Sequence, residues 1–126
     1  MTLIVFLVVM ASVFAETKFI VTSSLDEKKM PTDNLTEIPF DNSHEYLMFL
    51  YNDDNSAFGV EKVYLELSIY NDEASDYKYE TLYTIDTKTD WGYCYKGIKF
   101  NVPMKIRVRA FTDNGELATK YISVVK

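Results

Sequence analysis

The sequence predicts an all-β domain, built as an antiparallel sandwich of two sheets. Three observations support this prediction. Apolar residues recur from residue 45 onward with a period of about two rather than about 3.6. Val, Ile, Tyr and Phe fill most of these positions, and runs rich in Asp, Asn, Ser and Thr separate them. Strands with this alternation have one buried face and one solvated face.

The expected strands follow one another at short intervals. The segment 61–70 alternates most clearly, and in 104–112 we expect Lys105, Arg107, Arg109 and Phe111 to point outward. The turn at 113–115 reads Asp-Asn-Gly, which suits a tight hairpin because Asn and Gly tolerate positive φ. This spacing is typical of an immunoglobulin-like sandwich. The expected strands cover residues 18–22, 45–51, 61–70, 77–85, 91–100, 104–112 and 118–125.

A secretory signal peptide is predicted at residues 1–15. Residues 3–10 are an unbroken apolar run, and Val13 and Ala15 suit the small-residue positions of a cleavage site. A membrane-spanning helix needs about 20 apolar residues, so this run is too short to span. The alternative is a buried N-terminal strand. We therefore expect one secreted domain, residues 16–126, with a loop-rich part at 23–44 and no membrane contact after cleavage.

Charge and cysteine content restrict the partners and the source of stability. The net charge of −6 disfavours nucleic acid and anionic membrane surfaces. Cys94 is the only cysteine, so no intramolecular disulfide can form. We interpret Cys94 as a small buried hydrophobe, with an intermolecular bridge as the alternative.

No catalytic or metal-binding motif is recognisable. His44 is the only histidine and is interpreted as a solvated turn residue, so a site of several imidazoles is excluded. Pairs of carboxylates fall in predicted turns, where Asp and Asn are favoured for backbone reasons. Calcium binding by one such turn is the alternative. The sequence therefore predicts a protein that is not an enzyme and that uses no metal or cofactor.

Asn34-Leu35-Thr36 matches the acceptor pattern for N-linked glycans. The motif lies between Pro31 and Pro39 in a polar stretch, so we expect Asn34 in a surface loop and, in a eukaryotic host, glycosylated.

Aromatic residues are abundant, with ten Tyr, eight Phe and one Trp. We expect Tyr77, Tyr79, Tyr83 and Ile85 to share one face of their strand. One interpretation is that the tyrosines fill the sandwich core with their hydroxyls near water. The other is an exposed platform on which sugar rings stack while neighbouring polar groups bind the hydroxyls. The candidate carbohydrate-binding residues are Trp91, Tyr93, Tyr77, Tyr79, Tyr70, Asn71, Asp72 and Asp90.

Residues 58–64, continuing through Tyr70-Asn71-Asp72, resemble the opening strands of the starch-binding modules of fungal glucoamylases and glycogen-targeting phosphatase subunits. Residues 99–103 and 109–115 are similar to the later strands of those modules. The resemblance implies an immunoglobulin-like sandwich that binds an α-glucan-type polysaccharide through the aromatic loop near Tyr70 to Tyr77, and through Trp91. The closing Trp-Asp-Asn-Asn cluster of that family is absent, so part of one sugar site would be lost.

The same strands also resemble bacterial and fibronectin-like sandwich modules. Two functions are therefore expected. The first is a secreted, non-catalytic carbohydrate-binding module for polysaccharide. The alternative is an immunoglobulin-like or fibronectin-like module for protein interaction or adhesion.

Overall fold

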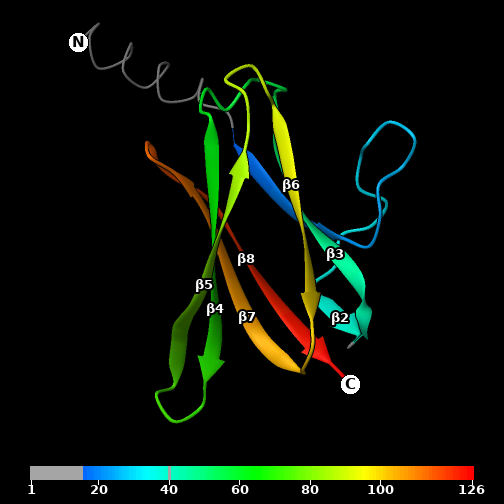
Figure 1. Ribbon diagram of the computed structural model, residues 1–126, viewed down its shortest axis with the longest axis vertical. Coiled ribbons are helices and arrows are strands. Elements are labelled where there is room, and N and C mark those ends of the chain that lie inside the picture. The colour runs from blue at the N-terminus through cyan, green and yellow to red at the C-terminus, as the bar shows by residue number, and fades with distance from the viewer. Residues whose placement is uncertain (1–15, 40) are drawn as a thin grey trace, which may run out of the picture.

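The computed structural model describes residues 16–39 and 41–126, so the predicted signal peptide lies outside the described residues. The described part contains eight strands (Figure 1). None of it forms a helix long and apolar enough to cross a membrane. The strands are β1 (Thr17–Thr22), β2 (Glu37–Pro39), β3 (Asp41–Asn52), β4 (Lys62–Asn71), β5 (Asp76–Asp86), β6 (Tyr93–Phe100), β7 (Met104–Thr112) and β8 (Gly115–Val125).

The strands form two sheets that pack face to face. The smaller sheet has the order β1-β3-β6 and the larger sheet the order β2-β8-β7-β4-β5. All pairs are antiparallel except β2, which pairs parallel to β8. The prediction of an all-β, two-sheet sandwich is therefore confirmed.

Alternating residues of both sheets fill the core. From the larger sheet, Val63, Leu65, Ile106 and Val108 are fully buried, and Met48 and Leu50 meet them from β3. The outward positions of β7 alternate with these as the sequence predicts. Cys94 lies in this core, and burial raises the pKa of its thiol to about 12. Its interpretation as a buried hydrophobe is confirmed.

The expectation that Tyr77 and Tyr79 share a face with Tyr83 and Ile85 is wrong. A β-bulge separates them, because Leu67 pairs with Thr81 while the next residue, Ser68, pairs with Tyr79. The extra residue is Glu80, and it reverses the alternation along β5. Tyr83 and Ile85 therefore face the core, whereas Tyr77 and Tyr79 face outward.

The segment 23–44 is less loop-rich than expected. It contains β2 and the beginning of β3. The loop from Ser23 onward is held by Asp33, whose carboxylate accepts hydrogen bonds from the Thr22 hydroxyl at 2.6 Å and the Ser23 hydroxyl at 2.7 Å. The sequence pattern does not predict β2, because this strand has only three residues and depends on a partner strand far along the chain.

His44 is not the solvated turn residue that the sequence suggests. It lies within β3, its Nε2 is 3.0 Å from the carbonyl oxygen of Ser23, and its ring meets Tyr46 edge to face. These contacts give the half-buried ring a structural role.

Candidate functional site

The structure divides the predicted carbohydrate-binding residues between two ends of the molecule. The β4–β5 turn lies at the bottom of Figure 1 and the β5–β6 connection at the top. Asp90 and Trp91 belong to the upper connection and Tyr93 to β6 of the smaller sheet. Tyr70, Asn71, Asp72, Tyr77 and Tyr79 belong to the lower hairpin of the larger sheet. The eight residues therefore do not form one platform.

The outer face of the larger sheet collects the tyrosines of the lower hairpin. Tyr70 pairs with Tyr77 across β4 and β5, and their ring centroids are 5.3 Å apart. Tyr79 is 63% exposed on the same face. Asn71 has a structural role here, because its Oδ1 accepts a hydrogen bond from the backbone N–H of Ala74 at 2.9 Å and thereby stabilises the turn.

Strands β7 and β8 bring three further residues to this face. Arg107 pairs with Ser68 on one side and Tyr121 on the other. Lys105 is the preceding outward residue of β7. We call the resulting surface the tyrosine–arginine face. It consists of Tyr70, Tyr77, Tyr79, Lys105, Arg107 and Tyr121.

The guanidinium of Arg107 lies against the Tyr77 ring, which in turn contacts Tyr121. The guanidinium carbon is 5.2 Å from the centroid of the Tyr77 ring, and Tyr77 approaches Tyr121 with 5.7 Å between centroids. Ser68, on the neighbouring strand, is 1% exposed.

No described residue accepts a hydrogen bond from Arg107, and its Nε is buried without a partner. A buried donor without an acceptor is costly, and stacking on Tyr77 offsets only part of that cost. Arg107 is therefore packed against the Tyr77 ring, and its buried Nε–H makes no hydrogen bond within the described residues.

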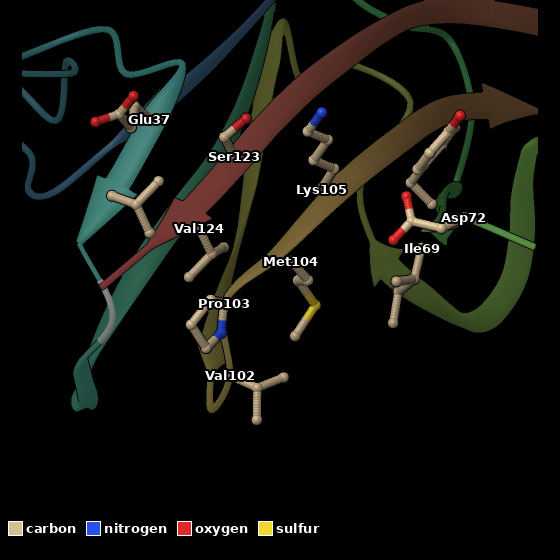
Figure 2. A pocket seen from close by; sticks show the side chains of 11 residues that line it. Glu37, Ile69, Asp72, Val102, Pro103, Met104, Lys105, Ser123 and Val124 are labelled. Carbon is tan, nitrogen blue, oxygen red and sulfur yellow. The ribbon is translucent and has the colours of Figure 1, made fainter. Parts of the chain in front are cut away.

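A hollow of about 610 Å³ adjoins this face at the lower end of the sandwich (Figure 2). Ile69, Val102, Met104 and Val124 provide apolar walls. Lys105 stands at the hollow and lies over the Tyr70 ring, with its Nζ 5.9 Å from the centroid. The hollow and the tyrosine–arginine face are thus continuous through Tyr70 and Lys105.

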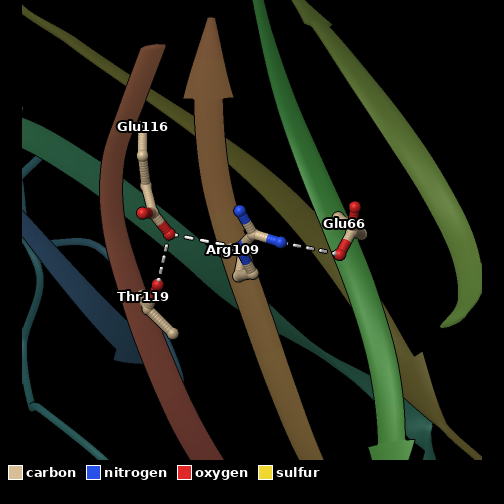
Figure 3. A network of polar contacts seen from close by, with 4 residues as sticks. All are labelled: Glu66, Arg109, Glu116 and Thr119. Carbon is tan, nitrogen blue, oxygen red and sulfur yellow. Dashed lines mark hydrogen bonds and ion pairs between the residues drawn. The ribbon is translucent and has the colours of Figure 1, made fainter. Parts of the chain in front are cut away.

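The upper half of the same outer face is organised differently (Figure 3). Arg109 pairs with Glu66 at 3.4 Å and with Glu116 at 3.1 Å, and the Thr119 hydroxyl donates to Glu116 at 3.0 Å. Hydrogen bonds from Arg109 and Thr119 lower the pKa of the Glu116 carboxyl. Both charged partners of Arg109 therefore belong to the fold itself.

The smaller sheet carries a second aromatic group on its outer face. Phe49 is fully buried between Tyr93 and Tyr95, whose rings lie within 13° and 8° of its plane. The two tyrosines also line a hollow of about 390 Å³, together with Ile85, Asp86, Trp91 and Cys94. Trp91 is 41% exposed, so this hollow presents an accessible aromatic wall beside a carboxylate.

Both edge strands on the open side of the sandwich carry inward-pointing lysines. Lys96 lies between the buried Cys94 and Ile98, and its Nζ is 5.8 Å from the Tyr83 ring on the opposite sheet. Lys78 pairs with the core-facing Ile69 at the edge of β5, next to the bulge at Glu80. Inward charges and bulges are devices that discourage another strand from adding to an edge.

The described residues contain no cluster of three or more metal-binding side chains. Asn34 is exposed, as predicted, and its Oδ1 accepts a hydrogen bond from Lys120 Nζ at 2.9 Å. Its glycosylation remains a prediction.

The sequence pattern does not predict a functional site at Lys105, Arg107 or Tyr121. The strict alternation of 104–112 already predicts that Lys105 and Arg107 point outward. Their proximity to the tyrosines depends on the strand order β8-β7-β4-β5, which periodicity does not encode.

No protein-family model matches the sequence, and the curated proteins contain no match to it. The fold is similar to the crystal structure of an immunoglobulin-like protein from Pseudomonas aeruginosa. The TM-score is 0.54 at 13% sequence identity, and the match covers 91% of this chain and 99% of the other. The chain therefore has an immunoglobulin-like fold.

Proposed function

We propose that this protein is a non-catalytic module that binds another protein through the tyrosine–arginine face. The observation that carries this proposal is the crossed arrangement of the rings. Tyr77 is inclined by 68° to Tyr70 and by 60° to Tyr121. A sugar ring stacks best on a flat, coplanar surface, whereas crossed rings suit the uneven surface of a protein partner.

The composition of the face also supports a protein partner. Tyr and Arg are enriched at protein–protein interfaces and among the residues that dominate binding energy. The rings are already packed against one another and against Arg107, so binding would order few side chains. The inward lysines of β5 and β6 make strand addition at an edge the less favourable mode.

A peptide selection tests this proposal. Peptides selected from a random displayed library on the purified protein should lose affinity by about 5-fold or more with Tyr79→Ala or Tyr121→Ala. Tyr95→Ala is the matched control, because Tyr95 is an exposed tyrosine on the other sheet. Failure to select any peptide, or equal binding to all three variants, would contradict the proposal.

Carbohydrate binding is the second candidate function, and the hollow beside Trp91 favours it. Its aromatic wall and Asp86 can stack against a sugar and bind its hydroxyls. Nothing in the comparisons points to starch in particular, so a panel of polysaccharides that includes soluble starch is the suitable probe. Retarded migration in such gels, abolished by Trp91→Ala and retained by Tyr79→Ala, would support this function. Unchanged migration on every polysaccharide would refute it.

We also propose that the protein acts outside the cell, which rests on the signal peptide predicted at residues 1–15. N-terminal sequencing of the exported protein should begin at Glu16.

A further inference from the structure

We infer that the partner of the tyrosine–arginine face is an acidic segment of a protein, which places a carboxylate on Arg107 and a neighbouring apolar side chain in the adjoining hollow. This inference rests on the proposed protein-binding function and specifies the chemistry of the partner.

Two cations on this face lack an ionic partner within the described residues. The protein carries a net charge of −6, yet Lys105 and Arg107 stand side by side without an ion pair to any described carboxylate. On the same strand, Arg109 is paired with two glutamates. The unpaired cations therefore mark the part of this face that is complementary to an anion.

The shape and orientation of the Arg107 side chain suit a carboxylate. Arg107 presents a planar guanidinium that matches a carboxylate, and none of its N–H donors is bonded to a described residue. Its Nε–H is buried, so the accessible Nη groups are the donors that a carboxylate can reach. The Tyr77 ring packs against the guanidinium and is itself in contact with Tyr121, so a carboxylate meets a donor that is already oriented. Partial burial strengthens such a charge-assisted hydrogen bond, because water competes for it less.

The lining of the adjoining hollow determines which kind of side chain fits there. Its walls are largely apolar, but Glu37 and Asp72 also line it. These carboxylates would repel an acidic group placed there. The hollow therefore suits an apolar side chain, and the acidic group belongs on the neighbouring row of residues, at Arg107. An extended segment with an apolar residue two positions from an acidic one spans both places.

The two arginines provide an internal comparison for the test, since the sequence contains only Arg107 and Arg109. Their side-chain Nε–H groups give separate signals in a ¹H–¹⁵N spectrum of the full chain. Arg107→Lys and Arg109→Lys assign these signals by removing one each. The probe is the peptide Ac-Leu-Ser-Glu-Ser-NH₂, and its Glu-to-Gln analogue is the uncharged control.

The acidic peptide should shift the Arg107 Nε–H signal in a saturable way and leave the Arg109 signal in place, because Arg109 already binds Glu116. The Gln peptide should shift neither.

An unmoved Arg107 signal, or equal shifts of both arginines, would overturn the inference. If selected peptides bind in a Tyr79-dependent way while Arg107 does not respond, the protein-binding function stands and only this inference fails. If no selected peptide depends on Tyr79 either, both fail.

Discussion

Arg107 and Arg109 occupy successive outward positions of β7, yet their surroundings differ. Arg109 lies between Glu66 on β4 and Glu116 on β8, and both carboxylates bind it. Arg107 lies between Ser68 and Tyr121, neither of which accepts a hydrogen bond from it. The identity of the cross-strand neighbours thus decides whether an arginine is occupied within the fold or available to a ligand.

The difference separates a structural arrangement from a candidate binding arrangement. Paired charges at an exposed site contribute little to stability, and their partners already neutralise the charge that would attract a ligand. Arg107, packed against the Tyr77 ring, has no acceptor within the described residues, and its accessible Nη groups can bind an acceptor that a partner supplies.

The largest effect should come from giving Arg107 an internal acceptor. Tyr121→Glu places a carboxylate directly across from it, so the lower half of the face comes to resemble the upper half. A selected acidic peptide should then lose about 100-fold or more in affinity, since its carboxylate meets both an occupied arginine and a like charge. Fluorescence anisotropy measures the loss. Tyr121→Gln, of the same length but uncharged, should lose clearly less, and equal losses would contradict the explanation.

Removing each arginine in turn should have unequal effects on the same peptide. Arg107→Gln should weaken binding by about 10- to 100-fold, the range expected for a hydrogen bond to a charged group. Arg109→Gln should change it by less than about 2-fold, because that guanidinium is already engaged by Glu66 and Glu116. Titration of the two variants under one salt condition makes the comparison, and similar losses would show that the peptide responds only to overall charge.

For the free energy of unfolding, the order should be reversed: losing Arg109 should cost more than losing Arg107. Arg107→Met removes a buried donor that lacks an acceptor, so the free energy of unfolding should stay constant or rise by up to about 1 kcal/mol. Arg109→Met breaks two ion pairs and should lower it slightly. Urea denaturation of both variants measures the difference, and a marked loss for Arg107→Met would mean that its stacking on Tyr77 outweighs the missing hydrogen bond.

Cys94 reports whether each variant keeps its fold. Because burial raises the pKa of its thiol to about 12, a thiol reagent at pH 8 should react slowly with the folded protein and quickly in urea. Rapid reaction of a variant without urea would exclude that variant from the comparison.

The smallest effect should be a pH dependence of the upper network. The pKa of Glu116 lies below its ordinary value of 4.5, so its stabilisation is present above that value and is lost as the pH falls through the lower pKa of the folded state. The melting temperature of the native protein should therefore be slightly higher than that of the Glu116→Gln variant at pH 7. The two melting temperatures should converge in more acidic solution. A melting difference that persists unchanged at low pH would contradict this assignment.

The sequence was sufficient for most of the strands but not for their faces at the lower hairpin. In 61–70 and 104–112, alternation predicts the faces correctly. The register does shift opposite Leu67 and Ser68 and opposite Ala110 and Phe111, but the extra residues lie in the partner strands β5 and β8, so β4 and β7 keep their own alternation. In 77–85, the bulge at Glu80 reverses the faces of Tyr77 and Tyr79. A bulge arises from the fit between two strands, so the pattern of one strand does not reveal it.

The candidate site was predicted only in part. Exposure of Tyr79, Trp91 and Tyr93 agrees with the expectation of accessible aromatic residues. The grouping of Trp91 with the hairpin tyrosines does not hold, because Trp91 belongs to the β5–β6 connection and the tyrosines to the β4–β5 hairpin. These two connections lie at opposite ends of the sandwich (Figure 1). Arg107 appeared in the sequence only as an outward residue, because its tyrosine neighbours come from strands that are distant along the chain.

What the sequence alone determined is the fold class, the turns and which residues of the regular strands are buried, all of which follow from local periodicity and turn chemistry. The tertiary structure decided which strands are neighbours, and with that whether a cation meets a carboxylate or a ring. Strand order depends on long-range pairing and on how two sheets fill one core. For this reason the contrast between Arg107 and Arg109 emerges only in the folded protein.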